Sequence, residues 1–201
     1  GYDGRLSSPQ LARALINGIL STGIDVINIG LCTTPMLYFS NYHLSTGTGV
    51  MITGSHNPPE YNGFKIVINE KTLSSDEIQH LYKIILNSSY QNGKGEEKSL
   101  SVKNDYLKKI SSSIKLKRPM KIAIDCGNGA GGVCAQELFE NLGVDVEAIF
   151  CDLDGNFPNH HPDPSDPKNF QDLKRILKEG NSELGLAFDG DADRLGVITK
   201  D

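Results

Sequence analysis

A serine loop and an aspartate loop carry the side chains of this sequence that could do chemistry. Ser55 lies in the stretch "TGSHNPPEYNGFK", directly before His56 and ten positions before Lys65. A Ser-His-Asp hydrolase is disfavoured, because adjacent side chains in an extended loop point apart and the stretch has no G-x-S-x-G pattern. Two interpretations stay open for this stretch alone, a reactive serine or a polar turn.

The aspartate loop is the stretch "DGDADR", whose three carboxylates alternate: Asp189, Asp191 and Asp193. On an extended backbone these side chains project to one side, and Gly190 lets the chain curl around a small ion. An EF-hand is disfavoured, because Arg194 and Lys200 occupy the positions that need glycine and glutamate. Three carboxylates between two apolar strands would repel one another, so the sequence predicts a magnesium site. Arg194 then either binds phosphate or forms ion pairs with the carboxylates.

A glycine-rich stretch, "GNGAGG" at 127–132, matches the G-x-G-x-x-G fingerprint of dinucleotide sites. It follows an expected strand and opens an expected helix, where pyrophosphate could bind. However, that strand ends in Asp125, which would face the phosphates, and the fingerprint explains neither Ser55 nor the aspartates. A tight turn between strand and helix is therefore the favoured interpretation.

Two further groups of potential ligands are assigned structural roles. The four cysteines show no C-x-x-C spacing and lie mostly in apolar stretches, which favours packing as small hydrophobes over disulfides or zinc: Cys32, Cys126, Cys134 and Cys151. The segment 152–168 is rich in Asp, Asn and Pro. We expect it to be a rigid surface loop, in which the adjacent His160 and His161 would chelate one ion poorly.

The composition is that of a soluble protein with a packed core. Of 201 residues, 38% are hydrophobic and 22% charged. The net charge of −5 and the scattered Lys and Arg disfavour nucleic-acid binding. The longest apolar runs, about six residues, are too short to span a membrane. The free cysteines favour a cytoplasmic location.

Alternating helix and strand patterns must position both loops. We expect helices from Ser8, from Thr34 and from Ser74 to about Ile85, with Ser8-Pro9 and the Ser74/Glu77 capping box as start signals, and helices at 103–114, 133–142 and 169–179. Strands are expected at 25–30, 49–53, 64–69, 120–125, 144–151, 184–188 and 195–199. The stretch 87–99 has no apolar periodicity, which predicts domains at 1–98 and 99–201.

The expected fold is α/β, with two three-layer α/β/α domains and mixed, mainly parallel sheets. Functional loops in such sheets gather at the carboxyl ends of strands. The serine loop follows strand 49–53, and the aspartate loop follows strand 184–188. Both loops therefore lie where chemistry is expected.

These motifs together resemble the alpha-D-phosphohexomutases, most closely the bacterial phosphomannomutase/phosphoglucomutase group. The resemblance extends over essentially the whole chain and also includes "GYDGRLSS" and "DGNFPNHHPDP". It implies that Ser55 is phosphorylated and that magnesium lies between this phosphate and the three aspartates. It further implies that Lys65 is a candidate general acid/base, that His56 shapes the site, and that Arg194 ends the metal loop.

The implied reaction interconverts hexose 1-phosphate and hexose 6-phosphate, mannose or glucose, through a hexose bisphosphate. Members of this family have four domains, and this chain resembles roughly the first two. We therefore expect a fragment that binds magnesium but turns over hexose phosphates poorly by itself, and we expect the sugar-selecting residues to lie elsewhere. Phosphoglucosamine mutase, a dinucleotide- or phosphate-binding module without catalysis, and a metal-dependent phosphatase remain alternatives.

Overall fold

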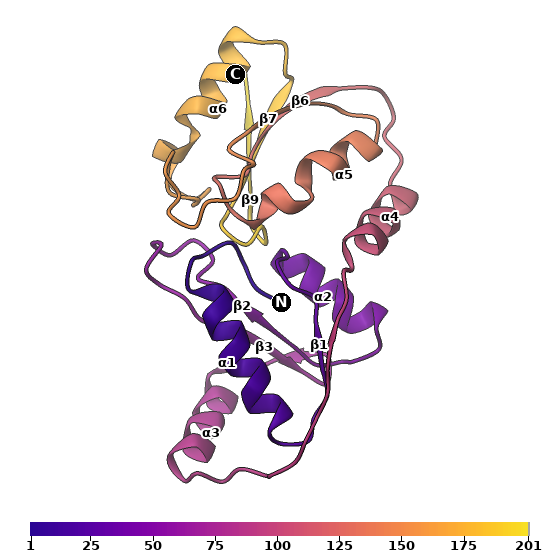
Figure 1. Cartoon of the computed structure of the whole chain (residues 1–201). Helices are drawn as coiled ribbons and strands as arrows, with labels where there is room; N and C mark the ends of the chain where they lie inside the picture. The colour runs from indigo at the N-terminus through magenta and orange to yellow at the C-terminus, as the bar shows by residue number, and fades with distance from the viewer. Residues whose placement is uncertain (201) are drawn as a thin grey trace.

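The computed structural model describes residues 1–200 and shows two α/β domains, one above the other (Figure 1). The elements of the first domain are α1 (Ser8–Leu20), β1 (Val26–Asn28), α2 (Thr34–His43), β2 (Gly49–Ile52), β3 (Phe64–Ile68), β4 (Lys71–Thr72), α3 (Ser75–Leu86) and β5 (Glu97–Ser99). The elements of the second are α4 (Lys103–Ser113), β6 (Lys121–Asp125), η1 (Ala130–Val133), α5 (Ala135–Asn141), β7 (Asp145–Ile149), η2 (Pro167–Phe170), α6 (Gln171–Glu179), β8 (Leu184–Phe188) and β9 (Leu195–Thr199).

Residues 1–3 join the two small sheets of the first domain into one layer. Tyr2 forms parallel bridges to Leu31 on one side and to Ile52 on the other. The amide of Tyr2 donates to the carbonyl of Gly30, and the amide of Asp3 donates to the carbonyl of Ile52. The spatial order is therefore β5-β1, residues 1–3, and β2-β3-β4. β1 and β5 are parallel, whereas β2, β3 and β4 are antiparallel.

The second domain has three layers around the sheet β7-β6-β8-β9. The first three strands are parallel and β9 is antiparallel to β8. Ile122 and Ile124 share a buried cluster with residues of α5, while Ala123, between them, packs with Leu173 of α6. Since successive side chains of a strand point to opposite faces, α5 and α6 cover opposite faces of this sheet. The predicted mixed α/β class is confirmed.

Several local expectations need correction. β4 and β5 have no counterpart among the expected strands, whereas the helix expected at 133–142 is present as α5, directly after the unexpected 3₁₀ turn η1. Ser8 does not cap α1, because its hydroxyl donates to the buried carboxylate of Asp3 at 2.6 Å. The Ser74/Glu77 capping box is present, with the Glu77 carboxylate accepting from the amide and hydroxyl of Ser74. The boundary at residues 98 and 99 stays a prediction.

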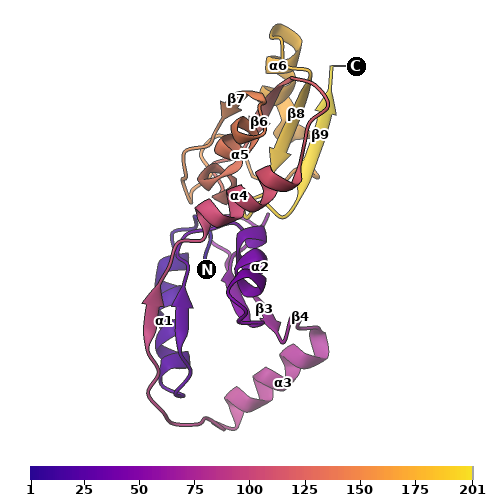
Figure 2. The ribbon, with the colours of Figure 1, turned by 90° about the vertical axis from the view of Figure 1, so that its right-hand side faces the viewer.

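One apolar cluster belongs to both domains. It joins α2 and β2 to α4 and to the start of α5, through the buried residues Cys32, Met36, Leu37, Met51, Val102, Leu107 and Cys134. α3 lies at the end of the first domain that is remote from this cluster (Figure 2), and all its residues are at least partly exposed. Across residues 1–200, no helix combines the length and the apolar character that crossing a bilayer would need.

Candidate active site

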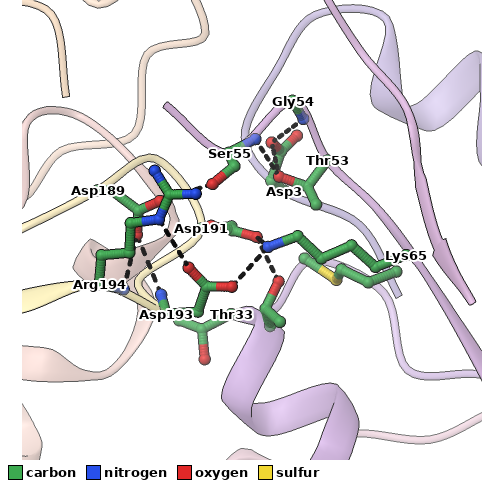
Figure 3. A network of polar contacts seen from close by, with 12 residues as sticks. Asp3, Thr33, Thr53, Gly54, Ser55, Lys65, Asp189, Asp191, Asp193 and Arg194 are labelled. Atoms are coloured by element: carbon green, nitrogen blue, oxygen red, sulfur yellow. Dashed lines mark hydrogen bonds and ion pairs between the residues drawn. The ribbon is translucent and has the colours of Figure 1, made fainter. Parts of the chain in front are cut away.

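The serine loop and the aspartate loop meet between the two domains. The hydroxyl of Ser55 donates to Oδ2 of Asp189 at 2.7 Å, although these residues are 134 positions apart in the chain. Both groups are buried, with Ser55 9% exposed and Asp189 fully enclosed. Figure 3 shows Ser55 arriving from the first domain and Asp189 from the loop between β8 and β9. The two sequence motifs thus form one site.

The buried side chain of Arg5 holds the serine loop in place. Its guanidinium donates to four carbonyl oxygens of this loop, those of Ser55, Asn57, Pro58 and Tyr61, at 2.5–3.0 Å. A side chain on Gly54 would collide with this guanidinium, since a Cβ there would lie 2.5 Å from its Cζ. The loop therefore wraps closely around Arg5, and Ser55 itself adopts a left-handed conformation with φ of 50°.

Asp3 neutralises Arg5 and ties it to the base of the serine loop. Its Oδ2 accepts from Nε of Arg5 at 3.1 Å and from the hydroxyl of Thr53 at 2.8 Å. The hydroxyl of Thr53 in turn accepts from the amide of Ser55 at 2.8 Å. Asp3 and Arg5 are each 1% exposed. Two charges are tolerated at such depth because each has several hydrogen-bond partners.

Backbone contacts from both domains fix the aspartate loop. Oδ1 of Asp189 accepts from the amides of Asp193 and Arg194, which curls the loop on itself. The amide of Thr34 in α2 donates to the carbonyl of Asp191 at 2.9 Å. Gly190 packs against the serine loop, where a Cβ would lie 2.3 Å from the Ser55 carbonyl oxygen. Glycine is required there because the two loops touch through their backbones.

Lys65 and Thr34 contact the carboxylates of the loop. The ammonium of Lys65 donates to Asp191 and to Asp193, each at 2.6 Å (Figure 3). The hydroxyl of Thr34 donates to Asp191 at 2.5 Å. The other oxygen of Asp191, Oδ1, is buried and accepts no hydrogen bond from residues 1–200. A buried carboxylate oxygen without a partner is costly, so a further positive group is needed beside it.

The three aspartates fit a hard cation. Each offers one oxygen, and these oxygens lie within 4.8 Å of one another. Carboxylate oxygens gathered in this way suit magnesium or calcium better than softer metals. Oδ1 of Asp191, which accepts no hydrogen bond from residues 1–200, is free to bind such a cation. The structure thus brings together the residues that the sequence proposed as ligands.

Burial and neighbouring charges shift the pKa values of the charged side chains of the site in different directions. Burial raises the pKa of Asp189 to about 7, and the adjacent charge of Asp191 adds to the effect. Burial also opposes ionisation of Asp191, but the hydrogen bonds from Lys65 and Thr34 prevail and its pKa is lowered. The pKa of Lys65 is raised, since its bonds to the two carboxylates outweigh its burial. A protonated Lys65 beside an ionised Asp191 is therefore the resting state.

His56 and Arg194 lie together at the exposed side of the site. Nη1 of Arg194 donates to Nδ1 of His56 at 2.5 Å, and Nε of Arg194 is 3.9 Å from Asp193. Arg194 therefore links the two loops. The ring of His56 is turned towards Arg194, in agreement with the expectation that it is not the base of a hydrolase.

The glycine-rich stretch at 127–132 supports the aspartate loop. The amide of Ala130, at the start of η1, donates to the carbonyl of Gly190 at 2.9 Å. A Cβ on Gly129 would lie 2.8 Å from that same carbonyl oxygen. The favoured interpretation as a tight turn agrees with this geometry, in which Gly127 adopts a φ of 52°.

The segment 152–168 is only partly a surface loop, which corrects the expectation. Phe157 is 8% exposed and its ring lies beneath the guanidinium of Arg5, 5.2 Å from Cζ to the ring centre. His160 contacts the buried carboxylate of Asp125 through Nε2 at 2.8 Å. The segment enters the interior because its aromatic and imidazole rings cover these two buried charged groups.

Three residues of the site were missed from the sequence, namely Asp3, Arg5 and Thr34. In the sequence, the stretch "GYDGRLSS" contributes only to the family resemblance, and Thr34 indicates only the start of a helix. Charged residues are mostly exposed, so a sequence gives little sign that one is buried. The available signal was the pair of opposite charges two positions apart in a loop rich in glycine and serine.

Comparisons with known proteins agree with this geometry. Residues 1–92 match the sequence model of phosphoglucomutase/phosphomannomutase alpha/beta/alpha domain I, and residues 104–201 match that of domain II. The chain is 55% identical to a phosphoglucomutase of Neisseria meningitidis over all its length, covering 44% of that protein. It is 48% identical to a phosphomannomutase/phosphoglucomutase of Pseudomonas aeruginosa over 99% of its length, covering 43% of that protein.

A solved structure shows the same fold. The crystal structure of a phosphoglucomutase/phosphomannomutase family protein of Burkholderia thailandensis superposes with a TM-score of 0.95 at 46% identity. The match covers all of this chain and 45% of that one. The chain therefore spans less than half the length of these relatives.

Proposed function

The chain belongs to the phosphoglucomutase/phosphomannomutase family of alpha-D-phosphohexomutases, and from this premise we propose that Ser55 carries a phosphoryl group between sugar positions. The reaction would interconvert hexose 1-phosphate and hexose 6-phosphate of mannose or glucose through a hexose bisphosphate. The single observation that carries the proposal is the 2.7 Å contact between the Ser55 hydroxyl and Asp189. It joins an oxygen that could carry phosphate to a cluster of cation ligands.

Asp189, Asp191 and Asp193 would hold the cation, and Ser55 would complete the set through its phosphoryl oxygens. Magnesium is the favoured identity, because it combines carboxylate ligands with phosphate oxygens. When bound, it would neutralise charge on the nonbridging oxygens of the phosphoryl group. The fit rests on the donor set and on the unpartnered buried oxygen of Asp191.

The reaction would proceed in two transfers. In the first, the bond between phosphorus and the Ser55 oxygen breaks, and a free hydroxyl of the hexose monophosphate forms a new bond to phosphorus and loses its proton. The bisphosphate then reorients. In the second, its original phosphate passes to Ser55, and the isomeric monophosphate leaves. Water must be kept away from phosphoserine, which the burial of Ser55 supports.

Lys65 would serve as the proton donor or acceptor near the reacting oxygens. Because its pKa is raised, the ammonium is the resting form, and it can donate a proton or bind phosphoryl oxygens directly. Removing a proton from a sugar hydroxyl would require this pKa to fall when substrate binds. Arg194 and His56 would orient the phosphoryl group from the exposed side of the site.

Intact mass analysis tests the phosphoserine. The protein is incubated with glucose 1,6-bisphosphate and magnesium, and we expect the mass of one phosphoryl group to be added to the native chain and not to Ser55→Ala. Peptide mapping should place the group on Ser55. Phosphate on another residue, or none in the presence of magnesium, would refute the proposal.

Product analysis separates the alternatives. A mutase gives isomerised sugar phosphate and a phosphatase gives free phosphate. Because the chain alone is expected to turn over substrate poorly, a binding module is instead recognised by the absence of phosphate on Ser55 in the mass analysis. Glucosamine 1-phosphate in the same coupled assay tests the phosphoglucosamine mutase alternative. We further propose that the 201-residue chain alone turns over substrate poorly, and that it resides in the cytoplasm, where its four free thiols fit a reducing environment.

A further inference from the structure

Two thiols meet at the ends of neighbouring strands, behind the aspartate loop. Cys126 follows β6, Cys151 lies just beyond β7, and their sulfur atoms are 3.1 Å apart. β6 and β7 are parallel and remain paired as far as Asp125 and Ile149. An S–S bond is about 2.05 Å long, so the two sulfurs have only about 1 Å left to close. Only a small movement of the sulfurs is therefore needed to bond them.

The two thiols differ in exposure and in pKa, as oxidation of one thiol and subsequent attack by the other require. Cys126 is fully buried, while Cys151 is partly exposed. The contact between the two thiols lowers the pKa of Cys151, although burial opposes this, and the same contact together with burial raises the pKa of Cys126. Cys151 is thus the accessible, more acidic thiol, and Cys126 is placed to resolve it.

We propose that Cys126 and Cys151 form a reversible disulfide when a hydroperoxide reaches Cys151, and that this bond weakens cation binding at the aspartate loop. In the first step, the sulfur of Cys151 attacks the peroxide. The O–O bond breaks, an S–O bond forms, and water or an alcohol leaves. In the second step, the sulfur of Cys126 displaces the sulfenic oxygen as water, and the S–S bond forms.

The other two cysteines lack this arrangement. Cys32 is fully buried and its sulfur contacts that of Met51 at 3.9 Å. Burial raises the pKa of Cys32 to about 11, and it raises that of Cys134 to about 11 as well. Both thiols therefore stay protonated and enclosed, and they serve as internal controls.

A short backbone path connects Cys126 to the aspartate loop. The carbonyl of Cys126 accepts from the amide of Gly129 at 2.8 Å, and the amide of Ala130 donates to the carbonyl of Gly190 at 2.9 Å. Gly129 and Gly190 are packed so closely that no Cβ fits between them. Any shift of the Cys126 backbone that accompanies the bond is therefore passed to the turn on which the aspartate loop rests.

Peroxide treatment followed by peptide mapping without reductant tests the bond. We expect hydrogen peroxide to produce a cross-linked peptide pair containing Cys126 and Cys151, with a mass loss of two hydrogen atoms, and dithiothreitol to reverse it. In Cys126→Ser, a sulfenic acid on Cys151 should be trapped by a 1,3-dione. In Cys151→Ser, Cys126 should stay reduced. Faster oxidation of Cys32 or Cys134, or sulfinic acid at Cys151 without a cross-link in the native chain, would overturn the proposal.

Calorimetric titration with Mn²⁺ tests the coupling, which rests on the proposed function. We expect the oxidised protein to bind Mn²⁺ about fivefold more weakly or worse, the lower end of ordinary coupling between sites, and reduction to restore binding. The double variant Cys126→Ala/Cys151→Ala, treated with peroxide in the same way, controls for oxidation elsewhere in the chain. Its affinity for Mn²⁺ should be unchanged. Equal binding by both forms would overturn the coupling. Failure of the reduced protein to bind would overturn the proposed metal site and the coupling, while leaving the cross-link result to stand by itself.

Discussion

Arg5 is the residue on which the shape of the serine loop depends most directly. It is buried, it donates to four carbonyl oxygens of the loop, and its only carboxylate partner by ion pairing among residues 1–200 is Asp3. Replacing Arg5 with methionine would leave Asp3 as an unpaired buried charge and would free four carbonyls. We predict a loss of about 3–5 kcal/mol in the free energy of unfolding, measured by urea denaturation.

Arg13 provides the matched control for Arg5. It also pairs with a carboxylate, that of Glu97 at 2.6 Å, but its side chain is 56% exposed. Because water and salt screen an exposed ion pair, Arg13→Met should leave the urea midpoint nearly unchanged. Equal effects of the two substitutions would show that the buried network around Arg5 adds nothing specific to the loop.

Asp189 makes cation binding dependent on pH. Burial and the charge of Asp191 raise the pKa of Asp189 from 3.8 to about 7. In the absence of a cation, the folded state holds this proton more tightly than the unfolded state. The resulting stabilisation is complete below about pH 4 and is lost as the pH rises through about 7. A cation replaces the proton, so the thermal shift caused by magnesium should grow between about pH 5.5 and 8.

Differential scanning fluorimetry with and without magnesium measures this dependence. In Asp189→Asn, no proton has to leave position 189, so the shift should become smaller and nearly independent of pH. An equal magnesium-induced shift at both pH values in the native protein would contradict the assignment of the raised pKa to Asp189.

At the scale of elements, the contact between the two loops depends on Gly190. A Cβ at this position would lie 2.3 Å from the Ser55 carbonyl oxygen, which is backbone and cannot turn aside. Gly190→Ala should therefore push the loops apart, cost about 1–3 kcal/mol of stability, and weaken Mn²⁺ binding. Gly18 in α1 has open space around its Cα. Gly18→Ala should be neutral or stabilise by up to about 1 kcal/mol, because alanine favours helix more than glycine does. Intact Mn²⁺ binding in Gly190→Ala would contradict this view of the loop contact.

The long periodic elements and the two loops could be predicted from the sequence, because their signals are local. The capping box of Ser74 and Glu77 and the apolar strand before Asp189 are examples. β4 and β5 could not, because strands of two and three exposed residues have no apolar alternation. Residues 1–3 act as a middle strand only through bonds to distant residues. The burial of Arg5 likewise depends on partners about fifty positions away.

At the scale of the whole molecule, the shared apolar cluster makes the relative position of the domains part of the site. Ser55 and Lys65 come from the first domain and the aspartates from the second, so any rotation between the domains would separate them. Leu107 of α4 is 3% exposed and belongs to the same buried cluster as Met36 and Met51. The cluster resembles the core of one folding unit more than a contact between two mobile ones.

We therefore predict that both domains unfold in a single transition and that Leu107→Ala lowers the stability of both. Removing this buried side chain should cost about 2–5 kcal/mol. Tyr82→Ser, on the outer helix α3, is the control, because Tyr82 is 54% exposed and should change stability little. Hydrogen exchange of β2 and of β6 should report the same opening free energy in the native protein and the same decrease in Leu107→Ala. If β6 kept its protection while β2 lost it, the domains would be independent, and the 2.7 Å contact between Ser55 and Asp189 would have to be maintained by the two loops alone.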